Sequence, residues 1–302
     1  MSPQKPARLT VADFDPEVMR LFDQYVHGQL DRRGFLDRAG RFAAASGTTA
    51  AGLLAALSPN FAAAQKVAPT DPRVKSERVE IPATAGHGKI NALVARPAQG
   101  AAALPIVLVV HENRGLNPHI EDIARRLAID NFIAVAPDVL TSLGGYPGDE
   151  DKARDAFAKL DQKKAAEDFV AAANYARGIA GGNGKLGATG FCWGGGIVNM
   201  VATRVPELVA AAPFYGAAPA LDQVGKIKAE LLVVYAETDE RINAMWPPYE
   251  AALKSAGVKY QAHIYPGTQH GFNNDTTPRF NEAQAKLAWE RTVALFNRTL
   301  RA

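Results

Sequence analysis

The sequence has little cysteine, since Cys192 is the single one among 302 residues. One cysteine excludes an intramolecular disulfide, so cysteine usage indicates nothing about the cell compartment. The chain also lacks C-x-x-C pairs and H-E-x-x-H, and its histidines show no metal-ligand spacing; they stand at positions 27, 87, 111, 119, 263 and 270. We therefore expect neither a metal nor a cofactor.

An excess of one charge is lacking as well. Lys and Arg number 34 against 31 Asp and Glu, which gives a net charge of +3. This balance argues against a surface that follows nucleic-acid phosphates. The glycine cluster at 194–196 lacks the order of a dinucleotide or phosphate loop. The expected partner is therefore a small molecule, and the sequence predicts no particular oligomeric state.

Apolar periodicity predicts the fold class. Two stretches of alternating polarity, 77–81 and 89–95, predict an antiparallel edge hairpin. Beyond them, apolar runs alternate with helical patterns, which predicts strands at 105–110, 132–136, 186–191, 209–214, 231–236 and 260–265 and helices near 118–130, 150–178, 195–204, 245–256 and 280–300. Such alternation indicates an α/β protein with a mainly parallel, doubly wound sheet covered on both faces.

Cys192 lies in the motif Gly190-Phe191-Cys192-Trp193-Gly194-Gly195, between a predicted strand and a predicted helix. The pattern is typical of a nucleophile elbow, a strained turn whose neighbours must be small and where esterases usually carry serine. A thiol at a helix N-terminus is biased toward thiolate, because free N–H groups and the helix dipole stabilise negative charge. The alternative is a small buried cysteine that only packs.

Two further candidates follow the last two predicted strands. Asp239 comes after the strand at 231–236, and His270 lies on the loop after the final strand. The chain order nucleophile, acid, histidine is that of α/β-hydrolases, whose sites lie at the carboxyl ends of the strands. We therefore predict an α/β-hydrolase domain over residues 70–302, without a large cap domain. In the predicted triad, Cys192 is the nucleophile, His270 takes its proton, and Asp239 fixes the histidine tautomer.

The loop after the strand at 105–110 supplies more candidates, because it begins His111-Glu112-Asn113-Arg114. In α/β-hydrolases this loop donates one oxyanion-hole N–H, and the residue after the nucleophile donates the other. By position, these donors are the backbone N–H groups of Asn113 and Trp193. Glu112 is unexpected, since a serine esterase needs no carboxylate there. Its alternative is an ion pair with Arg114 or Arg125.

Together, these motifs resemble the dienelactone hydrolase family (carboxymethylenebutenolidases), from roughly residue 74 to the C-terminus. The segments that carry the resemblance are HENRGLN, IEDIARRLA, GFCWGG, ETD and YPGTQHGF. The resemblance implies that Cys192 is the nucleophile, His270 the base and Asp239 its orienting acid. It also implies that Glu112 accepts the thiol proton when substrate enters, so that the thiolate forms only in the loaded site.

The sequence departs from the family where the substrate is selected. The resemblance implies two arginines for a substrate carboxylate, one of them in the loop after the strand at 132–136, but that loop has no arginine. Arg279 is a candidate for the second arginine, with a solvated residue at the start of the last helix as the alternative. Tyr146 and Tyr215 are candidate pocket residues.

These observations predict a hydrolase that cleaves a lactone or an activated enol or aryl ester through a thioester on Cys192. A thiolate expels a poor alkoxide leaving group badly, which argues against plain alkyl esters and amides. Three alternatives stay open. They are a general carboxylesterase or thioesterase, a thiol redox sensor in which Cys192 is oxidised, and a catalytically inactive homologue.

Residues 1–64 differ in composition from the rest of the chain. Arg32-Arg33 precede Phe35-Leu36, a weakly apolar stretch at 42–57 and the possible cleavage site Ala62-Ala63-Ala64. This pattern resembles a twin-arginine export signal and predicts a periplasmic or exported protein with no stable membrane span after processing. Acids outnumber bases before the arginines, which favours the alternative of a cytoplasmic protein that retains this segment as a helical arm.

Overall fold

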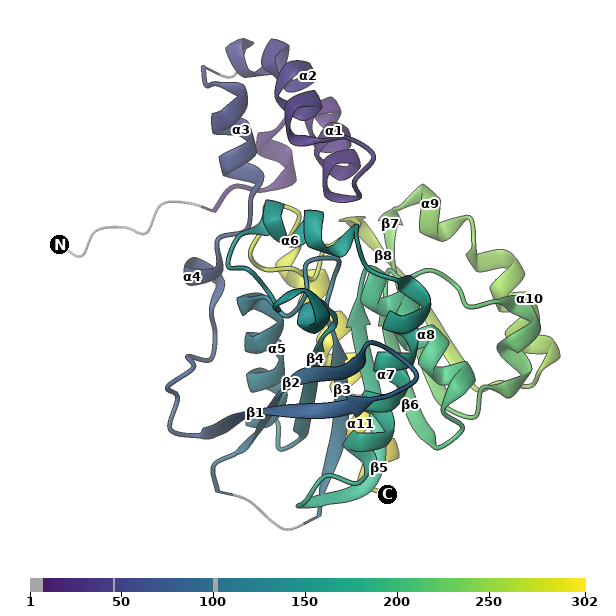
Figure 1. Cartoon of the computed structure of the whole chain (residues 1–302). Coiled ribbons are helices and arrows are strands. Elements are labelled where there is room, and N and C mark those ends of the chain that lie inside the picture. Colours follow the sequence, from purple (N-terminus) through teal and green to yellow (C-terminus); the bar gives the residue numbers. More distant parts are fainter. Residues whose placement is uncertain (1–7, 46, 100–102) are drawn as a thin grey trace.

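The computed structural model describes residues 8–45, 47–99 and 103–302. Its centre is an eight-stranded sheet in the order β1-β2-β4-β3-β5-β6-β7-β8 (Figure 1). The strands are β1 (Val74–Ala83), β2 (Gly88–Pro97), β3 (Leu104–Val110), β4 (Ile133–Asp138), β5 (Gly182–Phe191), β6 (Leu208–Phe214), β7 (Glu230–Thr238) and β8 (Tyr260–Gln269). β1 and β2 form an antiparallel hairpin, and β2 is also antiparallel to β4. From β4 through β8 all neighbours are parallel, which confirms the predicted fold class.

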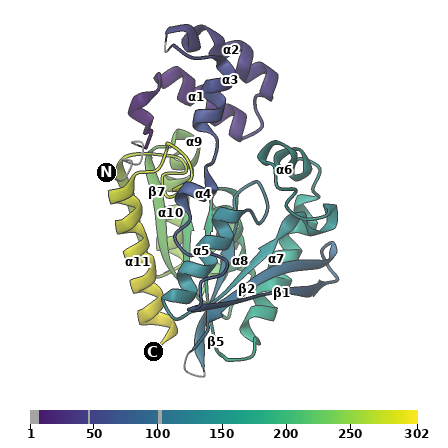
Figure 2. The ribbon, with the colours of Figure 1, turned by 90° about the vertical axis from the view of Figure 1, so that its left-hand side faces the viewer.

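Helices cover both faces of the sheet. On one face lie α5 (Pro118–Ile129) and α11 (Glu282–Leu300), and on the other lie α7 (Gln162–Arg177), α8 (Trp193–Arg204) and α10 (Trp246–Ser255) (Figure 2). The apolar run of β3 is continuous because its alternate side chains enter the cores on the two faces of the sheet. Ile106, Leu108 and Val110 join one core, and Val107 and Val109 join the other.

The single helix predicted near 150–178 is wrong. The structure has α6 (Glu150–Phe157) and α7 in its place, separated by a short turn. Asp161 causes the break, because its backbone is extended and its carboxylate accepts hydrogen bonds from the backbone N–H groups of Lys163 and Lys164. An aspartate at this position caps the second helix rather than continuing the first. The shorter segments are η1 (Val11–Asp13), η2 (Val139–Leu143), η3 (Leu221–Lys226) and α9 (Glu240–Asn243).

Residues 8–45 and 47–65, which we call the N-terminal arm, form a small helical unit over the carboxyl ends of the strands (Figures 1 and 2). Its helices are α1 (Pro16–Val26), α2 (Arg32–Ala45), α3 (Ala50–Leu57) and α4 (Phe61–Ala64). The first three share a core of their own, in which Phe22, Phe35 and Leu57 are buried. No helix in the part of the chain that the structure describes has the length and apolar character needed to cross a membrane.

Candidate active site

Cys192 occupies the sharp turn between β5 and α8 with φ 56° and ψ −118°. A non-glycine residue there is strained, and the surrounding chain must hold it in place. The neighbouring glycines make the close approach possible. A Cβ at Gly190 would lie 2.5 Å from the carbonyl oxygen of Gly194, and a Cβ at Gly194 would lie 2.4 Å from that of His111. The sequence therefore builds a nucleophile elbow around the sulfur.

The predicted acid and histidine meet beside this elbow. Asp239 follows β7 and His270 follows β8, and both are buried. Asp239 Oδ2 lies 2.6 Å from His270 Nδ1, which fixes the tautomer that leaves Nε2 free for the nucleophile. Among the described residues, His270 Nε2 has no hydrogen-bond partner, and a ring nitrogen of His270 lies within 4.8 Å of Cys192 Sγ. The structure thus brings the three residues of the predicted triad together.

The electrostatics favour an ion pair between the sulfur and the imidazole. Burial opposes a thiolate, but the charge of the nearby His270 and the hydrogen bond from His27 lower the pKa of Cys192 to about 6. Burial likewise opposes an imidazolium, but the Cys192 sulfur and Asp239 raise the pKa of His270 to about 10. Between these values the pair is thiolate and imidazolium, which is the reactive form of a cysteine nucleophile.

Glu112 lies in the loop after β3 and faces Asn274. The Asn274 amide donates a 2.9 Å hydrogen bond to Glu112 Oε2, and Asn274 itself is oriented by Thr276. Within the described ranges, no ion pair joins Glu112 to an arginine. The carboxylate nearest Arg114 is that of Glu150, at 3.9 Å, and the one nearest Arg125 is that of Glu121, at 3.6 Å. No hydrogen bond there joins Glu112 to Cys192 either.

A stacked ring pair joins the two segments that carry the predicted oxyanion donors Asn113 and Trp193. His111 stacks on Trp193 with 5.5 Å between ring centroids and accepts a hydrogen bond from the backbone N–H of Val139. This packing ties the loop after β3 to the elbow. In the ranges that the structure describes, the backbone N–H groups of Asn113 and Trp193 have no hydrogen-bond partner. Free donors of this kind are what a developing oxyanion requires.

A cavity of about 280 Å³ lies between the arm and the catalytic domain. The predicted residues Glu112, Asn113, Tyr146 and Arg279 contribute to its walls. Arg279 is not solvated at the start of α11, because it is 8% exposed. Tyr215 lies elsewhere, since its fully buried ring packs on His270 with 4.9 Å between centroids.

Two residues of this region were not predicted from the sequence as residues of the site. Arg114 was considered only as a partner for Glu112, yet it is buried and lines the cavity with Arg279. Its place in the same loop as Asn113 was the available signal. His27, at the end of α1, was not considered for the site, and its Nε2 lies 3.8 Å from Cys192 Sγ. No sequence pattern connects residue 27 with residue 192.

His27, Cys192 and His270 also form a group with the atoms that zinc prefers. Their three possible ligand atoms lie within 4.8 Å of one another. The histidine spacing in the sequence did not predict this group. A metal bound there would occupy the Cys192 sulfur, so it would compete with any reaction of that sulfur.

A sheet with this order, an elbow after β5, an acid after β7 and a histidine after β8 define an α/β-hydrolase. A model of the dienelactone hydrolase family matches residues 90–300, and the chain belongs to that family. A second family model, described as YqhI-like, matches residues 5–44. The family makes this chain a hydrolase of the carboxylic ester type.

Individual relatives agree with the family match. A protein of Salmonella typhi named "Putative carboxymethylenebutenolidase" is 33% identical, over 68% of this chain and 81% of the relative. The "Putative hydrolase fragment YghX" of Escherichia coli (strain K12) is 48% identical, over 37% of this chain and 97% of the relative. A solved structure titled as a putative dienelactone hydrolase of Klebsiella pneumoniae subsp. pneumoniae has a TM-score of 0.66 and 30% identity, and the match covers 74% of this chain and 98% of that one.

Proposed function

We propose that this enzyme hydrolyses a lactone or an activated ester, such as an enol or aryl ester, with Cys192 as its nucleophile. The observation that carries the proposal is the line from Asp239 through His270 to the Cys192 sulfur on a strained elbow. If Cys192 only packed in the core, nothing would explain why Asp239 and His270 meet beside it from the ends of two other strands. They also have no role in a redox sensor, which needs a reactive thiol but no oriented acid and base.

In the proposed reaction, the Cys192 thiolate attacks the acyl carbon and forms a tetrahedral intermediate. The backbone N–H groups of Trp193 and Asn113 hold its oxyanion. The intermediate collapses, the C–O bond breaks, and the His270 imidazolium gives its proton to the leaving oxygen. The neutral imidazole then removes a proton from water, whose oxygen attacks the thioester. The C–S bond breaks, which releases the acid and restores the Cys192 thiolate beside the His270 imidazolium.

The choice of substrate follows from leaving-group ability. When the tetrahedral intermediate collapses, sulfur competes with the substrate oxygen as the leaving group. An enolate or phenolate leaves readily, whereas an alkoxide or an amine leaves less readily than the thiolate. The proposed substrate is therefore an enol lactone or an aryl ester, and the alternative of broad esterase or thioesterase activity uses the same groups.

The proposal gives Glu112 the task of accepting the thiol proton when substrate enters. Glu112 lines the cavity, where a bound substrate would meet it, whereas Cys192 is not among the residues that line it. The lowered pKa of Cys192 supports a different resting state, in which the thiolate exists before substrate arrives. The two schemes differ in one measurable respect. A thiol that ionises only in the loaded site is alkylated slowly near neutral pH in the free enzyme, and a resting thiolate is alkylated fast.

The charged side chains that line the cavity bear on the charge of the substrate. Arg114 and Arg279 both line the cavity, and the Nε and Nη1 atoms of Arg279 have no hydrogen-bond partner among the described residues. Arg279 Nη1 forms an ion pair of 3.6 Å with Asp23, so a substrate carboxylate would compete with Asp23 for this buried guanidinium. Glu112 and Glu150 line the same cavity and oppose an anion. We propose a monoanionic lactone, held by Arg279 in place of the missing loop arginine.

The test compares kcat/KM of the full chain for a dienelactone and for a neutral aryl acetate, with Cys192→Ala as the control. A preference for the dienelactone of a hundredfold or more, about 3 kcal/mol of transition-state binding, supports the lactone proposal. Equal or better use of the aryl ester supports the broad esterase. A mass increase of one acyl group on Cys192 is expected in either case, and unchanged turnover by Cys192→Ala contradicts the mechanism.

A further inference from the structure

The end of α1 inserts into the candidate active site. His27 caps this helix, and its Nε2 lies 3.8 Å from the Cys192 sulfur. The imidazole rings of His27 and His270 pack edge to face with 4.9 Å between centroids. Both the sulfur and the His27 side chain are largely covered, since Cys192 is 7% exposed and the His27 side chain 12%. The nucleophile therefore lies between two imidazoles, one from the catalytic domain and one from the N-terminal arm.

The two imidazoles are held in the same way. Asp239 fixes His270 through Nδ1, and Asp23 fixes His27 through its Nδ1, which lies 2.8 Å from the Asp23 carbonyl oxygen and 3.3 Å from Oδ1. An acceptor at Nδ1 sets the tautomer and leaves Nε2 for the partner on the other side. In His27, that partner is Cys192 Sγ.

Residues of the catalytic domain bind the tip of the arm directly. The side chains of Asn113 and Arg114 donate hydrogen bonds of 2.9 and 3.2 Å to the carbonyl oxygen of Val26, the residue before His27. Arg279 pairs with Asp23 at 3.6 Å and lies over the ring of Phe22. The position of His27 is thus set by contacts of the catalytic domain with neighbouring residues of α1, and not by the end of a free helix.

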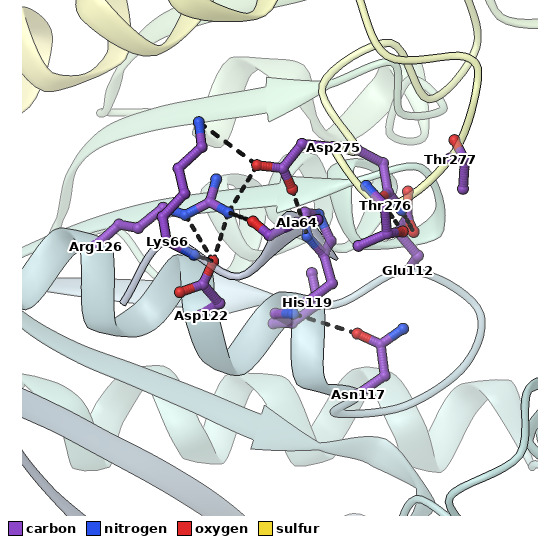
Figure 3. A network of polar contacts seen from close by, with 12 residues as sticks. Ala64, Lys66, Glu112, Asn117, His119, Asp122, Arg126, Asp275, Thr276 and Thr277 are labelled. Atoms are coloured by element: carbon purple, nitrogen blue, oxygen red, sulfur yellow. Dashed lines mark hydrogen bonds and ion pairs between the residues drawn. The ribbon is translucent and has the colours of Figure 1, made fainter. Parts of the chain in front are cut away.

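The base of the arm is anchored to the loop after His270. Arg8 donates to the carbonyl oxygens of Asp275 and Thr277, and the backbone N–H of Asn60 donates to that of Thr276. Figure 3 shows Asp275 of this loop bound by Lys66 and Arg126. The same loop carries Asn274, the partner of Glu112. The arm and the active site therefore share one supporting loop.

We propose that His27 is a residue of the active site, which the N-terminal arm delivers so that its Nε2–H donates a hydrogen bond to the Cys192 thiolate in the resting enzyme. The inference depends on the proposed function in two respects, namely that Cys192 is the nucleophile and that its thiolate exists before substrate arrives rather than forming through Glu112. It gives the arm a defined task, because a thiolate held by two imidazoles ionises at lower pH than one held by His270 alone. It also requires that His27 move aside when substrate reaches the sulfur.

The charges around His27 are consistent with a donor. Asp23 on α1 and the Cys192 sulfur favour the imidazolium, whereas His270, Arg279 near Asp23, and Arg241 on α9 oppose it. Arg241 Nη2 lies 3.4 Å from His27 Nε2, but this side chain is exposed to water, which screens its charge. Burial lowers the pKa of His27, but Asp23 and Cys192 raise it to about 9.

The experiment measures the rate of Cys192 alkylation by iodoacetamide against pH in the full chain. Cys192 is the sole cysteine, so the rate reports one site. The variants are His27→Gln, which removes the charge, and Asp23→Asn, which weakens the support of His27 from an exposed position. His263→Gln is the matched control, because it removes a partly buried histidine on β8 outside the site. The midpoint of the curve reports thiol ionisation, whereas its upper plateau also reports access to the sulfur.

In the wild type we expect a midpoint near 6. In His27→Gln the midpoint should rise by about one pH unit, a roughly tenfold loss of thiolate below it, with a smaller rise in Asp23→Asn. The control His263→Gln should match the wild type. Equal midpoints in His27→Gln and the wild type, with a raised midpoint in His270→Asn, would overturn the role of His27 and leave the proposed function standing. A wild-type midpoint near that of a free thiol, about 8.5, overturns the inference as well, and the acyl mass test then decides the function separately.

Discussion

At the scale of single residues, the reactivity of Cys192 is a balance of opposing terms. Burial destabilises any charge on the sulfur, and the neighbouring imidazoles stabilise a negative one. The imidazoles prevail because they are close, with His27 Nε2 3.8 Å from the sulfur and a ring nitrogen of His270 within 4.8 Å. The same proximity makes each partner raise or lower the pKa of the other, so the site titrates as a unit.

The pH dependence of activity follows from this pair. Thiolate forms as pH rises through about 6, and imidazolium is lost as pH rises through about 10. The acylation step needs both, so kcat/KM for an aryl ester should rise around pH 6, stay flat and fall around pH 10. An esterase assay with a substrate stable across this range checks the curve. An acid limb near 8 would show that the imidazoles do not activate the thiol.

In the proposed reaction, Asp239 has one defined role, which is to fix the tautomer of His270. Asp239→Asn keeps the size of the side chain but allows the wrong histidine tautomer, so kcat should fall by a factor on the order of 10³ or more with little change in KM. The neighbouring exposed carboxylate offers a control, and Glu240→Gln should leave kcat within about twofold. Steady-state kinetics on the purified variants decide the point. Similar losses in both variants would indicate a general effect of local charge.

At the scale of secondary-structure elements, much of the catalytic domain could be predicted from the sequence. Apolar runs located the strands because buried parallel strands have no polar face. Asp239 and His270 could be predicted because strand ends in an α/β-hydrolase share one edge. His27 could not, since its approach to Cys192 depends on how the arm packs, and no local pattern records that. The end of α6 and the start of α7 at Asp161 could not be predicted, because in a charged helical pattern a capping aspartate looks the same as an aspartate on the solvated face of one long helix.

The elbow itself can be tested as an element. In Gly194→Ala the new Cβ would meet the carbonyl oxygens of His111 and Val110 at 2.4 and 2.5 Å, and backbone atoms cannot rotate away. We expect the free energy of unfolding to fall by roughly 1–3 kcal/mol, with a loss of kcat because Trp193 shifts. Gly225→Ala in η3 is the control, since no atom lies within 4 Å of its Cβ. Chemical denaturation of both variants measures the difference, and equal stabilities would contradict the close packing.

At the scale of the whole molecule, the arm raises the question of processing. Export through a twin-arginine route stays a prediction. Cleavage after Ala64 would remove His27 and both helices that carry the twin-arginine pattern and the apolar stretch. It would fall next to Lys66 and Val67, whose backbone N–H groups are bound by the buried Asp122. The inference about His27 therefore applies to protein that keeps its arm.

The loop that anchors the arm contains the buried carboxylate of Asp275. This carboxylate is 4% exposed, and it pairs with Arg126 at 2.7 Å and Lys66 at 3.5 Å. Burial works against its charge, but the contact with His119 and the charge of Arg126 hold the pKa of Asp275 well below its usual value. A carboxylate of this kind stabilises the fold above its unfolded pKa, about 3.9, and the contribution is lost as pH falls toward the lower folded value.

Asp275→Asn should therefore lower the free energy of unfolding at pH 7 by roughly 2–4 kcal/mol, because it leaves the Arg126 charge without one of its partners. The gap in Tm between variant and wild type should narrow as pH falls below about 4, where the wild-type carboxylate also begins to lose its charge. Hydrogen exchange should be faster in residues 59–67 and in α1, since both depend on the loop that Asp275 supports. Asp37→Asn, which removes an exposed ion pair with Arg33, is the control and should change none of these. If Asp275→Asn lowers Tm without faster exchange in the arm, the loop stabilises the catalytic domain alone, and the arm reaches Cys192 through its tip contacts with Asn113 and Arg114.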